Sequence, residues 1–147
     1  MEILKIRKPD DWHVHLREGI ILKNIIKFTS DCFGRAIIMP NTKDPITTIE
    51  KAVSYKEYIL QSFPSTTNFN PLMTIYLTDS ISKDEIVEGY KNNIFFAAKL
   101  YPANATTNSS YGVTEIKKIY YLFELMQDIG MPLLIHGEVN DTDVDIF

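Results

Sequence analysis

The sequence predicts an α/β fold built from parallel βαβ units. Short apolar stretches suited to buried strands alternate with longer stretches whose apolar residues recur at helical spacing. Glycines, prolines and capping residues separate the two kinds of stretch along the chain. Because strict alternation of strand and helix is typical of parallel sheets, residues 1–147 are expected to belong to one α/β domain without an interior linker.

Five strands are expected from short apolar stretches that are rich in β-branched and aromatic residues. Turn residues bound them; Pro40, for example, cuts off the second strand. In chain order, the strands are predicted at residues 12–16, 35–39, 72–77, 95–101 and 133–136.

Four helices are expected between these strands. The first has an apolar stripe that includes Cys32, which is expected in the core, and Gly34 follows this helix as its C′ residue. Capping boxes at 47–50 and 82–85 open the second and third helices, and Pro64 ends the second.

The fourth helix has the clearest apolar stripe. Gly130, followed by Pro132, gives it a conventional end. Its inward residues are predicted to be Ile116, Ile119, Tyr120, Phe123 and Met126.

Composition restricts the classes of partner. The formal net charge of -4 gives no electrostatic reason to expect nucleic acid or an anionic membrane as a partner. The first residues carry charge where a signal peptide has its apolar region, and no apolar run approaches the roughly 18 residues of a membrane span. A single cysteine fits a reducing compartment, so we expect a cytoplasmic location.

Two architectures fit the alternation of strands and helices. One is a five-stranded doubly wound sheet of flavodoxin type, and the other is part of a (β/α)8 barrel, which takes about 250 residues. Hydrophobic periodicity does not distinguish the two architectures. The polar residues within the strands can distinguish them.

Two histidines flank Val14 in the first predicted strand. Because side chains alternate along a strand, His13 and His15 project from the same face and offer two nitrogen ligands to a divalent metal. An H-x-H pair alone is more often a surface or core feature than a metal site.

A lysine and a third histidine lie at comparable positions in later strands. Lys99 is surrounded by residues that favour burial, and a buried ammonium costs several kcal/mol unless it is paired or neutralised. The lysine either reaches solvent or a carboxylate at a strand end, or its amine has a chemical role. His136 ends the fifth predicted strand, so all three histidines and this lysine fall in or at the ends of strands.

Arg17 and Asn41 follow the first two strands, where ligands of parallel sheets bind. Arginine offers a bidentate fork for a carboxylate, whereas Asn41 taken alone suits a turn after Pro40. The polar loop at 103–110 is either an inert connection or a lid.

Together these segments resemble the single-domain bacterial type of dihydroorotase, over nearly all 147 residues. The lysine segment is the most specific part of the resemblance. The matching segments are Asp11-Trp12-His13-Val14-His15-Leu16-Arg17, Gly34-Arg35-Ala36-Ile37-Ile38-Met39-Pro40-Asn41, Pro71-Leu72-Met73-Thr74, Tyr76-Leu77-Thr78-Asp79-Ser80, Ala97-Ala98-Lys99-Leu100-Tyr101-Pro102-Ala103-Asn104-Ala105-Thr106-Thr107-Asn108-Ser109-Ser110, Gly130-Met131-Pro132-Leu133-Leu134 and His136-Gly137-Glu138.

The resemblance implies a (β/α)8 TIM barrel of the metallo-dependent hydrolase type, of which this chain supplies about five strands and four helices. It implies two zinc ions bridged by an N6-carboxylated Lys99, with His13 and His15 on the more buried zinc and His136 on the second. A carbamate would replace the buried ammonium with an anion facing two cations.

The same resemblance implies the reaction and its substrate contacts. The reaction is the interconversion of N-carbamoyl-L-aspartate and L-dihydroorotate in pyrimidine biosynthesis. Arg17 and Asn41 would hold the substrate carboxylate, and Thr106 and Thr107 would lie on a loop that closes over the substrate. Homodimerisation is expected from the family alone.

The sequence departs from the family in one respect. The family also uses a later histidine and an aspartate that shuttles the proton; no histidine follows His136, and the general-base aspartate is expected beyond Phe147. None of Asp141, Asp143 and Asp145 is assigned that role. We therefore expect these 147 residues alone to be inactive.

Two alternatives stand beside a dihydroorotase. One is another cyclic amidohydrolase, such as a hydantoinase, which the lysine segment and its threonine loop argue against. The other is a non-catalytic half-barrel scaffold that pairs with another chain.

Overall fold

The computed structural model describes residues 3–63 and 68–138. Strands and helices alternate in them as the sequence predicts. In chain order, the elements are β1 (Asp10–Val14), α1 (Gly19–Cys32), β2 (Arg35–Ile38), α2 (Ile49–Gln61), β3 (Asn70–Tyr76), α3 (Lys83–Lys91), β4 (Ala97–Leu100), the 3-10 turn η1 (Ile116–Ile119), α4 (Tyr120–Ile129) and β5 (Leu133–Ile135).

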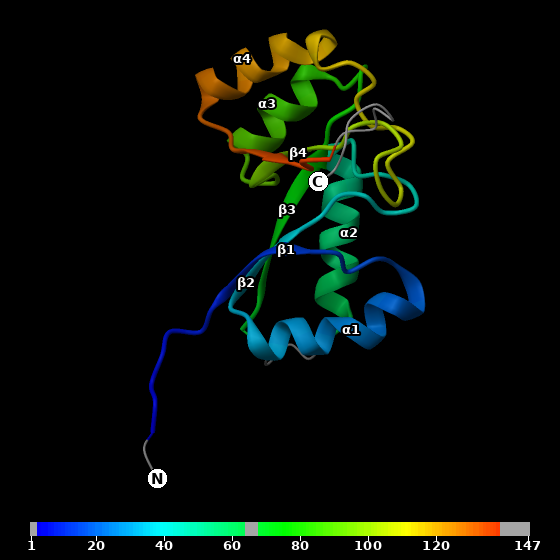
Figure 1. The fold of residues 1–147 in the computed structure, drawn as a ribbon. Helices are drawn as coiled ribbons and strands as arrows, with labels where there is room; N and C mark the ends of the chain where they lie inside the picture. The colour runs from blue at the N-terminus through cyan, green and yellow to red at the C-terminus, as the bar shows by residue number, and fades with distance from the viewer. Residues whose placement is uncertain (1–2, 64–67, 139–147) are drawn as a thin grey trace.

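The five strands form one parallel sheet in which spatial order follows chain order, β1-β2-β3-β4-β5. Figure 1 shows the sheet curling, with the helices outside it. A flavodoxin-type sheet has the order 2-1-3-4-5, whereas consecutive parallel neighbours are the arrangement of a barrel. The strand order therefore decides between the two architectures in favour of a half-barrel of the TIM type.

The core lies between the outer helices and the sheet. Leu22 and Ile26 of α1 and Ile59 of α2 are fully buried there, against strand residues such as Ile38 and Ile75. Because these helices cover the outer face of the sheet, polar residues at the strand ends are left to face the inside of the curl.

Cys32 is exposed, contrary to the prediction. The buried stripe of α1 comprises Leu22, Ile26, Thr29 and Ser30. At 3.6 residues per turn, Cys32 lies about 100° around the helix from the centre of that stripe. It is therefore a surface residue of the last turn.

The ends of α1 and α4 differ from each other. Gly34 follows the C-cap of α1, but its φ is not positive; its N–H donates to the Pro9 carbonyl, so it already belongs to the sheet. Gly130 ends α4 with a φ of 73° in the left-handed region, as predicted for a glycine at a helix end.

The predicted capping boxes are wrong in detail. Thr48, one residue later than expected, caps α2 by accepting from the Lys51 N–H. Ser82 does cap α3. Glu85, however, accepts from the Ile49 N–H at 2.5 Å, so it links the starts of α2 and α3 instead of closing its own box. Pro64 lies outside the described residues.

The stripe of the fourth helix is also partly wrong. Ile116 and Tyr120 are 47% and 51% exposed, whereas Ile119, Leu122 and Met126 are buried. The segment starts as the 3-10 turn η1, which has three residues per turn, so its first residues are out of phase with the α-helical stripe.

None of the helices in the described ranges combines the length and the apolar character needed to cross a membrane.

Candidate active site

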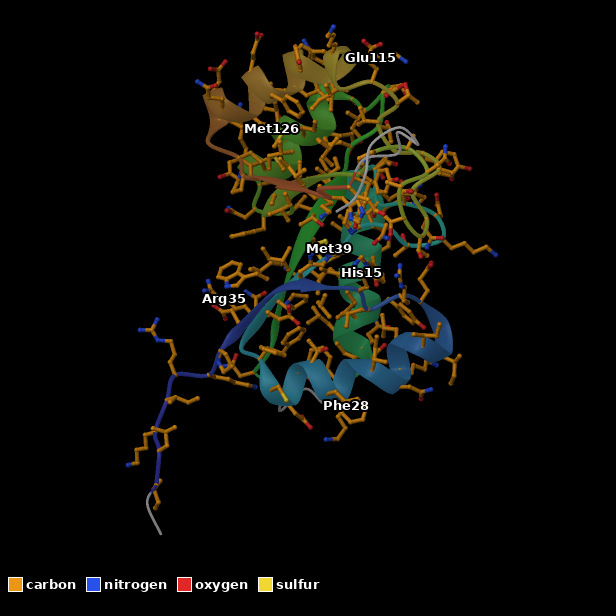
Figure 2. The ribbon with its side chains drawn as sticks, viewed as in Figure 1. His15, Phe28, Arg35, Met39, Glu115 and Met126 are labelled. Atoms are coloured by element: carbon orange, nitrogen blue, oxygen red, sulfur yellow. The ribbon has the colours of Figure 1, made fainter. Side chains whose placement is uncertain are left out.

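The predicted site residues lie at the carboxyl ends of the strands. Figure 2 shows His15 just after β1, beside Met39 just after β2. The Met39 N–H donates to the Val14 carbonyl at 2.9 Å, which ties the two strand ends together. Ligand sites of (β/α)8 folds lie at this end of the sheet.

His13 and His15 point at each other, as strand alternation predicts. Their Nε2 atoms are 3.1 Å apart. Two nitrogen ligands of one tetrahedral zinc, each at its usual bond length, are about 3.3 Å apart. The pair is thus spaced for one metal ion.

Both imidazoles are held in the neutral form that binds metals. Burial, aided by the charge of Arg17, lowers the pKa of His15 to about 4. Burial, and after it the charge of Lys99, lowers the pKa of His13 below its ordinary value. The His15 Nδ1 lies 2.8 Å from the Asn41 Oδ1. An amide oxygen only accepts, so Nδ1 carries the proton and the Nε2 lone pair is free.

Lys99 is 1% exposed in β4. No carboxylate of the described residues lies within ion-pair distance of its amine. Its Nζ lies 5.0 Å from the centre of the Tyr101 ring. Burial lowers the pKa of Lys99. Of the alternatives that the sequence left open, the lysine therefore does not reach solvent, and its amine is buried beside the histidines.

His136 lies one residue beyond β5, with its N–H donating to the Leu100 carbonyl. Its ring lies 5.8 Å from the Tyr101 ring, so it shares the site. Its Nε2 faces the Glu138 carboxylate at 2.8 Å. No cluster of three or more histidine, cysteine, aspartate or glutamate side chains forms within the described ranges. The converging groups are two histidines and a lysine, with His136 at the edge.

Asn41 connects the parts of the site, and it is not a simple turn residue. It is 2% exposed. Its Oδ1 binds His15, and its Nδ2 donates to the Thr107 carbonyl at 2.9 Å. Its backbone carbonyl accepts from the Arg17 guanidinium at 3.2 Å and from the Asn108 amide at 3.0 Å. Asn41, which follows β2, therefore contacts residues that follow β1 and residues of the loop after β4.

The threonine loop folds back over the same strand ends. Thr106 and Ser109 bind each other, through the Thr106 N–H to the Ser109 Oγ and the Ser109 hydroxyl to the Thr106 carbonyl. The Tyr76 hydroxyl donates to the Asn108 carbonyl at 3.3 Å. The Thr107 side chain is exposed, while its carbonyl is held by Asn41.

Two buried tyrosines of the site were not predicted. Tyr76 and Tyr101 stack with their ring centres 5.1 Å apart. Burial raises the pKa of Tyr76 to about 12, and that of Tyr101 also rises, so both hydroxyls remain donors. The Tyr101 hydroxyl is buried and has no hydrogen-bond partner within the part of the chain that the structure describes. In the sequence, these tyrosines could have been recognised as site residues only from their positions, in or directly after strands that carry other polar residues. Asp141, Asp143 and Asp145 lie outside the described residues.

Comparison with known proteins finds dihydroorotases that are similar to this chain. No family model matches it. The dihydroorotases of Salmonella paratyphi B and Salmonella newport are each 56% identical to it over 146 residues, which cover 99% of this chain and 42% of theirs. The chain thus spans about two-fifths of the length of these relatives.

Two crystal structures have the same arrangement of strands and helices. Dihydroorotase from Campylobacter jejuni has a TM-score of 0.83 and 37% identity, over 91% of this chain and 39% of that one. Dihydroorotase from Saccharomyces cerevisiae in complex with 5-fluoroorotic acid has a TM-score of 0.80 and 35% identity, over 93% and 38%. In sequence and in fold, the chain is related to the amino-terminal portion of dihydroorotases.

Proposed function

We propose that this chain carries part of the active site of a zinc-dependent cyclic amidohydrolase that interconverts N-carbamoyl-L-aspartate and L-dihydroorotate. The observation that carries the proposal is the convergence of the His13 and His15 Nε2 atoms, 3.1 Å apart, beside the buried amine of Lys99. The relatives that share these segments are dihydroorotases.

The residues present fit a pair of zinc ions. His13 and His15 are spaced for one ion, and His136 is the candidate ligand of the second. Reaction of the Lys99 amine with carbon dioxide, with release of one proton to solvent, would give a carbamate, an anion able to hold both metals. It would also remove a buried ammonium that has no carboxylate partner among the described residues. Zinc held by these residues would supply Lewis acidity and an activated water for hydrolysis of the ring amide.

The other residues would hold the substrate. Arg17 offers a fork of donors for the substrate carboxylate. Because the net charge of the chain is -4, the positive charge that attracts this carboxylate has to come from a local side chain. Asn41 holds Arg17 through its backbone and His15 through its side chain, so the carboxylate site has a defined place relative to the metal site. Thr106 and Thr107 would close over the substrate from the loop that Asn41 anchors.

Turnover and metal content of the purified gene product test this proposal together. We expect conversion of L-dihydroorotate but not of hydantoin, with two zinc ions per chain by mass spectrometry. Lys99→Ala should abolish both turnover and the second zinc, whereas Lys91→Ala, at an exposed lysine of α3, should change neither. Turnover of hydantoin alone would favour the hydantoinase alternative. An inactive product isolated in a stable complex with another protein would favour the scaffold.

We further infer that the complete enzyme works in the cytoplasm as a homodimer on small molecules alone, without nucleic acid or membrane partners. Sedimentation of the gene product at micromolar concentration tests the dimer. A monomer that retains full activity would contradict it.

A further inference from the structure

The backbone of Arg17 adopts an unusual conformation. Its φ is 58°, in the left-handed region that residues with a side chain rarely enter. Such conformations persist only where neighbouring contacts hold them, and they gather at functional sites. The turn between β1 and α1 therefore needs an anchor near Arg17.

Tyr55 of α2 supplies such an anchor. Its hydroxyl donates to the Arg17 carbonyl at 2.6 Å, and the side chain is 7% exposed. At the other end of the residue, the Arg17 guanidinium donates to the Asn41 carbonyl. The next residue is also held, because the Glu18 carboxylate accepts from the Lys43 N–H at 2.8 Å. The turn is thus fixed from the outer helix and from the neighbouring strand end.

We propose that Tyr55 is a positioning residue, which holds Arg17 in its left-handed conformation so that the guanidinium meets the substrate carboxylate. This inference rests on the proposed function, in which Arg17 binds that carboxylate. Tyr55 lies on the outer layer and would touch neither substrate nor metal. It would act through Arg17, so its effect should appear in substrate binding.

Tyr58 is a matched control. It lies on the same helix and also donates to a carbonyl of the same turn, that of Gly19, but at 3.4 Å. A hydrogen bond of that length contributes little. Glycine also tolerates a positive φ, as its value of 59° at Gly19 illustrates, so this residue does not need to be held.

The experiment compares Tyr55→Phe and Tyr58→Phe in the purified gene product. In Tyr55→Phe we expect KM for N-carbamoyl-L-aspartate and L-dihydroorotate to rise about fivefold, the change that corresponds to one ordinary hydrogen bond, with kcat within about twofold. Tyr58→Phe should change neither constant. A purely structural role of Tyr55 would lower the active fraction and hence kcat, and would leave KM unchanged.

A second measurement does not need turnover. Hydrogen–deuterium exchange of the peptide at 15–21 should be faster in Tyr55→Phe than in wild type and unchanged in Tyr58→Phe. Equal KM values in the two variants, or equal exchange, would overturn the inference. A wild-type protein that turns over neither substrate would instead contradict the proposed function, and the exchange comparison would then decide the role of Tyr55.

Discussion

Replacing Lys99 by methionine should stabilise the metal-free protein while removing its activity. The side chain is 1% exposed, and no carboxylate of the described residues pairs with it. Methionine retains most of the apolar stem and removes the amine. The native amine is thus expected to cost stability until it is modified and bound to metal.

The size of the effect follows from two opposing contributions. Burying an ammonium costs several kcal/mol, and its contact with the Tyr101 ring at 5.0 Å returns about 1 to 2 kcal/mol. A net gain of about 2 kcal/mol for Lys99→Met remains after this offset. In a protein of this size, each kcal/mol shifts the midpoint of thermal unfolding by about 2–4 °C, so we expect Tm to rise by about 4–8 °C.

Calorimetry on chelator-treated gene product measures this shift. Lys27→Met is the control, because Lys27 lies on the surface of α1, paired with Asp31, and its replacement should move Tm by no more than about 2 °C. Adding zinc and bicarbonate should stabilise wild type more than Lys99→Met, which keeps only the first zinc site. A metal-free Lys99→Met protein that unfolds at or below the wild-type temperature would refute the reasoning.

Three further substitutions test the packing of an outer helix and the hydrogen bonds of the loops and the site. Gly89→Ala should destabilise the fold by about 3 kcal/mol in urea unfolding, because the new Cβ would lie 2.2 Å from the Phe95 ring; a loss under about 1 kcal/mol would show that the ring moves aside easily. Hydrogen bonds from Thr114 lower the pKa of Asp79, so its stabilisation is present above the unfolded pKa of about 3.9 and is lost as pH falls through the folded value. Asp79→Asn should therefore lower stability at pH 7, and this effect should shrink as pH falls below about 3.9; a difference that stays constant through the acid range would contradict this. Asn41→Leu should weaken zinc binding about 10- to 100-fold in a competition titration, since it removes the partner that orients a histidine ligand, and unchanged affinity would contradict that role.

The alternation of elements was predictable because it depends on local patterns. All five strands and all four helices appear within a few residues of their predicted places. The strand order was not available from periodicity, because a doubly wound sheet and a barrel use the same βαβ unit. The polar residues at strand ends carried that information, since only a closed curl brings the first, fourth and fifth strands to one interior.

Details that depend on contacts between distant segments could not be predicted. Glu85 fits a local capping box, yet it binds the first residue of α2, because the two helix starts lie close together. Tyr55 looks like any apolar residue of its helix, and nothing nearby in the sequence reveals that its hydroxyl reaches Arg17. Local sequence rules describe one helix or strand at a time. These contacts join two separate segments, so such rules do not predict them.

The hydrogen bonds of Asn41 imply that the metal site, the carboxylate site and the loop are not independent. One buried side chain binds His15 with its oxygen and the Thr107 carbonyl with its amino group, while its backbone carbonyl holds Arg17. If the loop opens, the amino group loses its partner, and the cost of leaving a buried donor unpaired favours closure. Groups that share partners in this way show non-additive effects on substitution. Variants of Asn41 and of the loop should therefore disturb zinc affinity and KM together, by less in combination than the sum of their single effects.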